Sequence, residues 1–379
     1  MKAEDVYAVL WKYFEKSAKQ CFNQVEMYLI IQFYLRSRKM KLKKEFEDFY
    51  KCIRIDSETQ NLIDKRETLE GEIKDKFPTI MKNHDIELNK SDIRMIDQGS
   101  YKYNTTIKST VVDRDVAVMI PLDTSENPDP RKIKKYLKES IDIPVRSVSI
   151  KEPCVRAAYY EKGEEWLHID LPLYANDNGE IYLARGKASS NEYLWERADP
   201  DGLNNDLCGK INGHDQLRRI ICLIKKWKNE KYSSSTKDHE VPPSIGLTYL
   251  ACDCFSEQTS NDGDDDLLAL QKTMKSIKDK FLCTKNAQGE IVSADISRYL
   301  PVQPYTDIFK KMRDSSTSYM ITFYKRLSIA VDNLTNAVNV ESAHDAAEYV
   351  QKVLGPEFTV PAKEAVAVAT QSKKEHSFG

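Results

Sequence analysis

The feature that most constrains this chain is a pair of acids at the entrance to an apolar strand. Asp113 and Asp115 stand one residue apart, and the apolar run Val116–Ile120 (VAVMI) follows them directly. Because side chains on a strand alternate between two faces, the two carboxylates point the same way and Arg114 points the other way. Carboxylates that lead into a buried strand are costly unless they bind something. The pattern therefore predicts a strand that presents two acids to a cation.

A later segment carries a third acid in a similar setting. In Trp166–Leu173 (WLHIDLPL), Asp170 lies on the opposite strand face from its apolar neighbours. If this strand lies beside the first, the three acids form a triad for two Mg²⁺ ions, with Mn²⁺ as a substitute. An isolated DxD pair is common in solvated loops, so the prediction of a metal site depends largely on the third acid and on the upstream Gly99-Ser100 turn. We expect His168, in the same segment, to sit one strand position away from the Asp170 face and to satisfy a structural hydrogen bond.

The hydrophobic pattern changes twice along the chain. It has helical period before about residue 90, short β-branched and aromatic runs between residues 93 and 183, and helical period again from His214. This order predicts an α/β (α+β) fold in which a sheet packs against a helical lobe, with the active site in the cleft between them. We expect a core lobe over residues 1–205 that includes the N-terminal helices, a helical lobe over 206–356, and a flexible tail over 357–379.

Composition disfavours several classes of protein. Lys and Arg total 57 against 59 Asp and Glu, so there is no overall basic field of the kind that DNA-coating proteins carry. No apolar run approaches the length of a membrane span, and the first residues lack the apolar core of a signal peptide. The 8 cysteines show no paired CxxC spacing, so we expect reduced thiols in a cytoplasmic protein.

The segment Gln98–Thr105 (QGSYKYNT), followed by the spaced acids, resembles the polymerase β-like nucleotidyltransferase superfamily. Within it, the chain is similar to the bacterial cGAS/DncV-like nucleotidyltransferases (CD-NTases) of CBASS antiphage operons. Three further segments follow in the family's order: Trp195–Leu203, Arg218–Trp227 and Pro243–Leu247. The resemblance implies a mixed core sheet of five to seven strands and gives catalytic and metal-binding roles to Asp113, Asp115 and Asp170. The family usually has an apolar residue where this chain has Arg114, whose side chain we expect to pair with a local carboxylate.

The resemblance also implies a nucleotide site. It assigns contacts with the substrate to Gln98, Gly99, Ser100, Tyr103, Lys225 and Ser244. Tyr103 would stack on a base, and Lys225 and Ser244 would hold the triphosphate. Ser244 follows two prolines, which predicts an N-cap at a helix end that attracts phosphate. By itself, Lys225 would more readily be interpreted as a solvated lysine on an amphipathic helix.

The function that the resemblance implies is synthesis of a cyclic di- or trinucleotide messenger from nucleoside triphosphates, ATP among them, in antiphage defence. The alternatives are a linear oligonucleotide synthetase of the oligoadenylate type and a tRNA nucleotidyltransferase. The balanced charge disfavours the tRNA enzyme, which should have a basic RNA-binding surface. A binding module that has lost catalysis is a further alternative, and the three retained acids argue against it.

The resemblance implies partners as well. The product would activate a downstream effector, and an operon-encoded enzyme of the ubiquitin-activating and conjugating type would join the C-terminal Gly379 to a target amine. A terminal glycine has no Cβ to obstruct that chemistry. The chain shows no inserted zinc-binding loop, so we expect no sensing of double-stranded DNA, and we expect no membrane partner.

Overall fold

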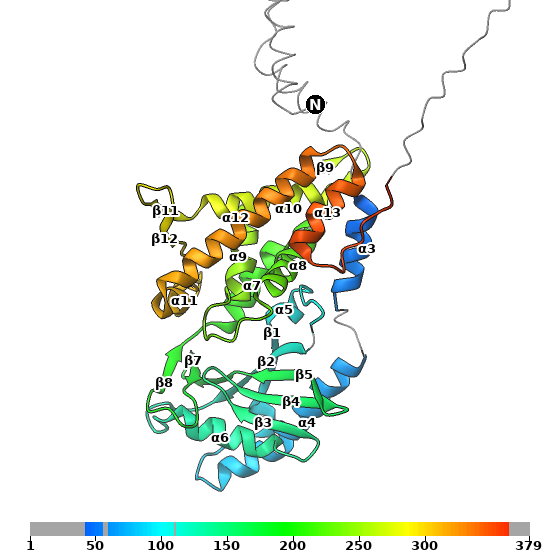
Figure 1. Ribbon diagram of the computed structural model, residues 1–379. Coiled ribbons are helices and arrows are strands. Elements are labelled where there is room, and N and C mark those ends of the chain that lie inside the picture. Colours follow the sequence, from blue (N-terminus) through cyan, green and yellow to red (C-terminus); the bar gives the residue numbers. More distant parts are fainter. Residues whose placement is uncertain (1–41, 56–59, 110, 364–379) are drawn as a thin grey trace, which may run out of the picture.

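The computed structural model describes residues 42–55, 60–109 and 111–363. The helical pattern of the first 41 residues, and Gly379, lie outside the described part of the chain. Figure 1 shows a helical lobe stacked on a sheet lobe, which confirms the expected fold class. None of the described helices is long and apolar enough to cross a membrane.

The helices of the described residues are α3 (Lys43–Ile53), α4 (Gln60–Lys82), α5 (Gly99–Lys102), α6 (Pro130–Ile141), α7 (Pro200–Ile211), α8 (Asp215–Tyr232), α9 (Ser244–Cys254), α10 (Asp266–Asp279), α11 (Lys310–Ser315), α12 (Thr317–Asn339) and α13 (Ala343–Leu354). The main sheet consists of β1 (Arg94–Gln98), β2 (Val112–Pro121), β3 (Arg146–Ile150), β4 (Val155–Glu161), β5 (Glu164–Leu171), β6 (Leu173–Asp177), β7 (Glu180–Arg185) and β8 (Leu194–Arg197). Two small hairpins pair β9 (Thr259–Ser260) with β10 (Gly263–Asp264) and β11 (Leu282–Lys285) with β12 (Ile291–Asp295).

The main sheet is mixed and is built around β2. Val118 pairs with β1 on one edge of β2 and with β6 on the other, so the two neighbours flank it. Strands β5 and β6 follow the same edge in parallel with β2, separated at Pro172, which has no N–H to donate to a ladder. The single strand expected over Trp166–Leu173 is therefore two strands. With β8 added, the sheet has 8 strands instead of the expected five to seven.

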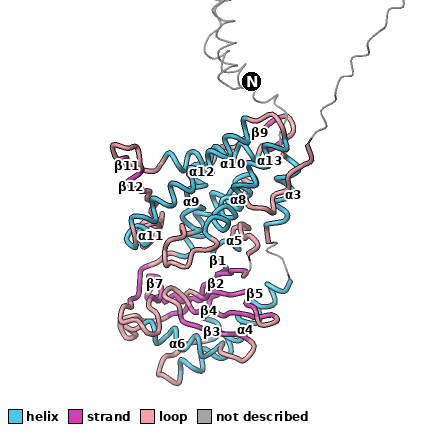
Figure 2. The backbone as a smooth tube through the Cα atoms, viewed as in Figure 1, coloured by secondary structure: helices cyan, strands magenta, loops and turns pink. Residues whose placement is uncertain are grey.

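One face of the sheet is covered by α4 and α6 (Figure 2). Alternate residues of β2, namely Val116, Val118 and Ile120, are buried there in an apolar core with both helices. The sequence interpretation missed α6, although Asp129 caps its N-terminus and Pro130 occupies its first turn. Because this face is filled, the other set of alternating residues in β2, which includes Asp113 and Asp115, faces the helical lobe.

The helical lobe has a separate core that includes Trp227, Tyr249 and Phe323. Helix α3 belongs to this core although it precedes the sheet in the sequence, and its Phe46 and Phe49 rings meet Phe358 edge-on. The described N-terminal helices are thus divided between the two cores, because α4 packs against the sheet. The expected division after residue 205 falls within α7, and it stays a proposal.

Candidate active site

The structure brings the three acids to neighbouring positions on one face of the sheet. In the parallel register of β2 and β5, Asp113 lies beside His168 and Asp115 lies beside Asp170. Since side chains alternate along both strands, all four residues point to the same side. Asp170 is far from the other two acids in the sequence, and one strand pairing is enough to assemble all three.

A cavity of about 500 Å³ opens above this part of the sheet. It lies between the sheet and helices α7, α8 and α9, and its volume suits a nucleotide-sized ligand. Its lining includes Gln98, Gly99, Ser100, Tyr103, Asp113, Asp115, Lys225, Lys228 and Ser244. The cavity thus collects two of the acids and all six residues expected to contact nucleotide.

The turn at Gly99 brings main chain against one of the acids. Gly99 has φ of 66°, and a Cβ at this position would collide with Oδ2 of Asp115. Only glycine meets both conditions without strain. The next residue, Ser100, is fixed by a hydrogen bond of 3.0 Å between its Oγ and Oγ1 of Thr106. Gln98, which precedes the turn, pairs with Asp115 in the β1–β2 register.

The acids differ in their charge environment. Arg156 of β4 donates two hydrogen bonds of 2.7 Å to the two carboxylate oxygens of Asp170. Burial, together with the charges of Asp113 and Asp170, raises the pKa of Asp115. For Asp113, burial is the largest cause and acts in the same direction, but the hydrogen bond from His168 and the positive charges of His168, Arg156 and Lys228 together outweigh it and lower the pKa. Only one of the three carboxylates is paired with a guanidinium, and this oxygen-rich set fits divalent cations such as Mg²⁺ or Mn²⁺.

His168 does not have the position that the sequence interpretation gave it. Its Nε2 lies 3.0 Å from Oδ1 of Asp113, and its Nδ1 lies 2.8 Å from Oε1 of Glu165. Because His168 and Asp170 are two residues apart on a strand, they share a face, and the expectation that His168 lies off that face was wrong. The two-residue spacing was the signal that could have found it.

Lys225 is a buried side chain with fixed partners. Its Nζ donates to the carbonyl oxygen of Thr105 at 3.1 Å and to the hydroxyl of the same residue at 3.0 Å. Burial lowers the pKa of Lys225 to about 8. The interpretation as a solvated lysine on a helix surface is therefore wrong, and the ammonium group lies at the wall of the cavity.

Ser244 is the first residue of α9 and not its N-cap. Pro243 occupies the N-cap position and no side chain caps the helix, so that detail of the prediction was wrong. Oγ of Ser244 instead accepts a hydrogen bond of 2.6 Å from Nζ of Lys228. Lys228, which the sequence interpretation missed, follows Lys225 by three residues on α8 and shares its helix face.

Tyr103 lines the cavity, but most of its surface is covered. The side chain is 5% exposed, and its hydroxyl donates a hydrogen bond of 2.7 Å to Oδ1 of Asn204 on α7. Stacking of this ring on a base stays a proposal.

Arg114 has the local carboxylate that we expected. It points away from the acids, donates to Oδ1 of Asp97 at 2.9 Å and to the carbonyl oxygen of Leu62 at 2.7 Å, and stacks on the ring of Tyr101.

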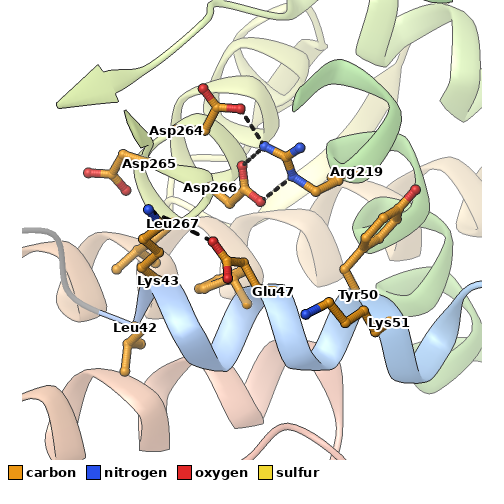
Figure 3. A pocket seen from close by; sticks show the side chains of 11 residues that line it. Leu42, Lys43, Glu47, Tyr50, Lys51, Arg219, Asp264, Asp265, Asp266 and Leu267 are labelled. Atoms are coloured by element: carbon orange, nitrogen blue, oxygen red, sulfur yellow. Dashed lines mark hydrogen bonds and ion pairs between the residues drawn. The ribbon is translucent and has the colours of Figure 1, made fainter. Parts of the chain in front are cut away.

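A second cavity, of about 280 Å³, lies between α3, α8 and the start of α10 (Figure 3). Arg219 points into it and pairs with Asp264 and Asp266. Two of its acids, Asp264 and Asp266, are thus paired with one arginine, whereas on β2 and β5 Arg156 pairs with Asp170 alone. The cavity above the sheet is therefore the candidate active site.

Comparison with known proteins gives a consistent result. Residues 93–174, which include the three acids, match the family model described as "Cyclic GMP-AMP synthase DncV-like, nucleotidyltransferase domain". The crystal structure of the Vibrio cholerae DncV cyclic AMP-GMP synthase matches with a TM-score of 0.60 at 16% identity, over 86% of this chain and 100% of that chain. No curated protein sequence matches the chain.

Two structures of the same Vibrio cholerae synthase with bound nucleotides also match. The complex with nonhydrolyzable GTP has a TM-score of 0.62 at 16% identity, over 86% of this chain and 100% of that chain. The complex with the linear intermediate 5' pppA(3',5')pG has a TM-score of 0.60 at 15% identity, over 85% and 97% of the two chains. At these identities the likeness establishes the fold.

Proposed function

We propose that the chain is a nucleotidyltransferase that joins nucleoside triphosphates into a cyclic di- or trinucleotide and releases pyrophosphate. The match of residues 93–174 to the DncV-like nucleotidyltransferase family model supports this proposal. The observation that carries the proposal is the pairing of β2 with β5, which sets three acids on one sheet face beside a cavity of nucleotide size. A structure of the same fold with a linear dinucleotide intermediate supports a reaction in two rounds.

In this proposal, Asp113, Asp115 and Asp170 hold two Mg²⁺ ions, for which Mn²⁺ can substitute. Bound there, the ions would neutralise the triphosphate and the leaving pyrophosphate. The Gly99-Ser100 turn lies against Asp115, so its main chain approaches the same phosphates. The remaining contacts are assigned to Gln98 at the end of β1, Tyr103 beneath the base, and Lys225, Lys228 and Ser244 on the triphosphate.

The chain's own residues then position an in-line displacement. An acceptor ribose hydroxyl held near Asp170 attacks the α-phosphorus of the donor, a new P–O bond forms, and the bond to the pyrophosphate oxygen breaks. Lys225 and Lys228 approach the cavity from one face of α8, where their charge favours the negative triphosphate. In the second round the linear product is turned round and closed.

The test is incubation of the purified chain with labelled ATP, GTP, CTP and UTP in Mg²⁺ or Mn²⁺, followed by phosphatase digestion. We expect a phosphatase-resistant product, which indicates a closed ring. A product that phosphatase degrades would indicate a linear oligonucleotide synthetase instead. The matched control replaces Asp113 and Asp115 with Asn, which should abolish product without loss of the fold, because two carboxylates in a crowded negative site are removed.

The biological setting belongs to the same proposal. We propose a cytoplasmic bacterial enzyme of a CBASS antiphage system, whose product activates an effector and whose Gly379 is conjugated by an operon-encoded ubiquitin-activating-like enzyme. The resemblance of Gln98–Thr105 and the spaced acids to the family supports this setting.

A further inference from the structure

The nucleotidyltransferase reaction gives His168 no role, yet this side chain stands among the acids. It projects from β5 on the same face as Asp170 and lies directly across the strand pair from Asp113. With a side-chain exposure of 12%, the imidazole is held between its neighbours.

The ligand atoms nearest to one another at this site include a nitrogen. The carboxylate oxygens of Asp113 and Asp170 and a ring nitrogen of His168 all lie within 4.8 Å of one another. Asp115 does not belong to this group, and its Oδ2 faces the main chain at Gly99. The three groups that converge are therefore two carboxylates and one imidazole.

Glu165 fixes which nitrogen faces the acids. Its carboxylate can only accept, so the hydrogen bond of 2.8 Å places a hydrogen on Nδ1 of His168 and turns Nε2 toward Asp113. A carboxylate behind the far ring nitrogen is the arrangement that orients histidine ligands in metal sites. A cation between Asp113 and Nε2 would take the place of the hydrogen that joins them in the metal-free chain.

We propose that His168 is a metal ligand, whose Nε2 joins Asp113 and Asp170 in holding one of the two divalent ions, with Glu165 as the residue that orients the ring. The inference rests on the proposed two-metal reaction and adds a nitrogen donor to it. Imidazole suits the later transition metals best, and Mn²⁺, the weakest binder of that first-row series, still accepts a nitrogen donor more readily than Mg²⁺, which demands oxygen ligands. The ratio of Mn²⁺ affinity to Mg²⁺ affinity is therefore higher at this site than at a site made of three carboxylates alone.

The test uses the full chain freed of metal and titrated with Mn²⁺, with Mg²⁺ as competitor. Pulsed electron paramagnetic resonance of the Mn²⁺ complex should show modulation from an imidazole nitrogen, and His168→Gln should lose it. His168→Gln should weaken Mn²⁺ binding by about tenfold or more and weaken Mg²⁺ binding less. Glu165→Gln should keep the nitrogen signal and weaken binding by a smaller factor. The control is His84→Gln, because His84 stacks on Tyr136 and is not part of the ligand group.

A wild-type Mn²⁺ complex without imidazole modulation would overturn the assignment, and so would modulation that persists in His168→Gln. An unchanged Mn²⁺ affinity in that variant would overturn it as well. If the modulation appears and disappears as expected but the wild-type protein joins no nucleotides, His168 stands as a ligand and the proposed function fails. The two ideas are thus separated by experiment.

Discussion

At the scale of single residues, the site depends on small spacings that admit few replacements. Gly99 is the clearest case, because its backbone has φ of 66° and a side chain there would meet Asp115. The 8% exposure of Gln98 just before it shows how tightly this turn is enclosed. The glycine therefore sets how close the main chain of this turn comes to Asp115.

We expect Gly99→Ala to abolish product formation in the phosphatase assay while the protein still folds. The positive φ costs alanine about 1–2 kcal/mol, and the added methyl displaces the carboxylate of Asp115. The matched control is Gly289→Ala in the β11–β12 hairpin, where φ is 81° and nothing lies near the added atom. It carries the same backbone strain and should keep activity. Equal activity in both variants would show that the close approach at Gly99 does not matter.

At the scale of elements, helix α8 places two lysine side chains at the cavity, and the two have different hydrogen-bond partners. Lys225 is buried against Thr105, whereas Lys228 extends to Ser244 at the start of α9. Burial lowers the pKa of both ammonium groups, to about 8 for Lys225. The triphosphate site that we propose therefore lies where two helices and the turn after β1 meet.

Substrate binding should depend on pH through Lys225. Its pKa of about 8 in the folded chain lies below the usual value of 10.5 for lysine. The metal-free chain therefore loses this charge as pH rises through 8, while bound phosphate favours the charged form. We expect affinity for a nonhydrolyzable triphosphate to fall above pH 8 by up to about tenfold per unit. Lys225→Ala should weaken binding about ten- to a hundredfold at pH 7 and flatten the profile.

Ser244→Ala is the matched comparison, because it removes a proposed phosphate contact that does not titrate. It should raise KM with little change in kcat and keep the pH profile of the wild type. A large loss of kcat with an unchanged KM in Lys225→Ala would instead assign that lysine to the transition state. Isothermal titration and steady-state rates at several pH values make the measurement.

At the scale of the whole molecule, the candidate active site lies between the two hydrophobic cores. The first and last described segments of the chain pack against each other in the helical core. Phe358, near the end of the described residues, is fully buried between Phe46 and Phe49 of α3. Glu357 pairs with Lys226 on α8, the helix that carries the two cavity lysines. The described chain, which ends at residue 363, is thus anchored to the helical core by Glu357 and Phe358.

We expect deletion of Phe378-Gly379, or Gly379→Glu, to leave nucleotide synthesis by the purified enzyme unchanged. The same variants should form no higher-mass conjugates when the chain is produced together with the ubiquitin-activating-like enzyme that we propose as its partner. Immunoblots of the two co-expressions make the comparison. Conjugates that persist without Gly379 would contradict the proposal that this residue is the point of attachment.

The features that the sequence determined by itself are those set by local geometry. The alternation of β2 predicts that Asp113 and Asp115 share a face and that Arg114 is turned away, and the structure has both features. Helical period places α8, α9 and α13 within a few residues of their observed bounds. These patterns depend only on the side-chain period of a strand or a helix, which can be recognised from the order of apolar and polar residues in the sequence.

The features that only the tertiary structure decided are those set by register and packing between distant segments. His168 meets Asp113 because β5 pairs with β2 at one register, and Arg156 meets Asp170 because β4 pairs with β5. Helix α3 joins the helical core because its aromatic face is buried against Phe358 and not against the sheet. No local pattern encodes such contacts, because their free energy depends on which distant surface each element covers.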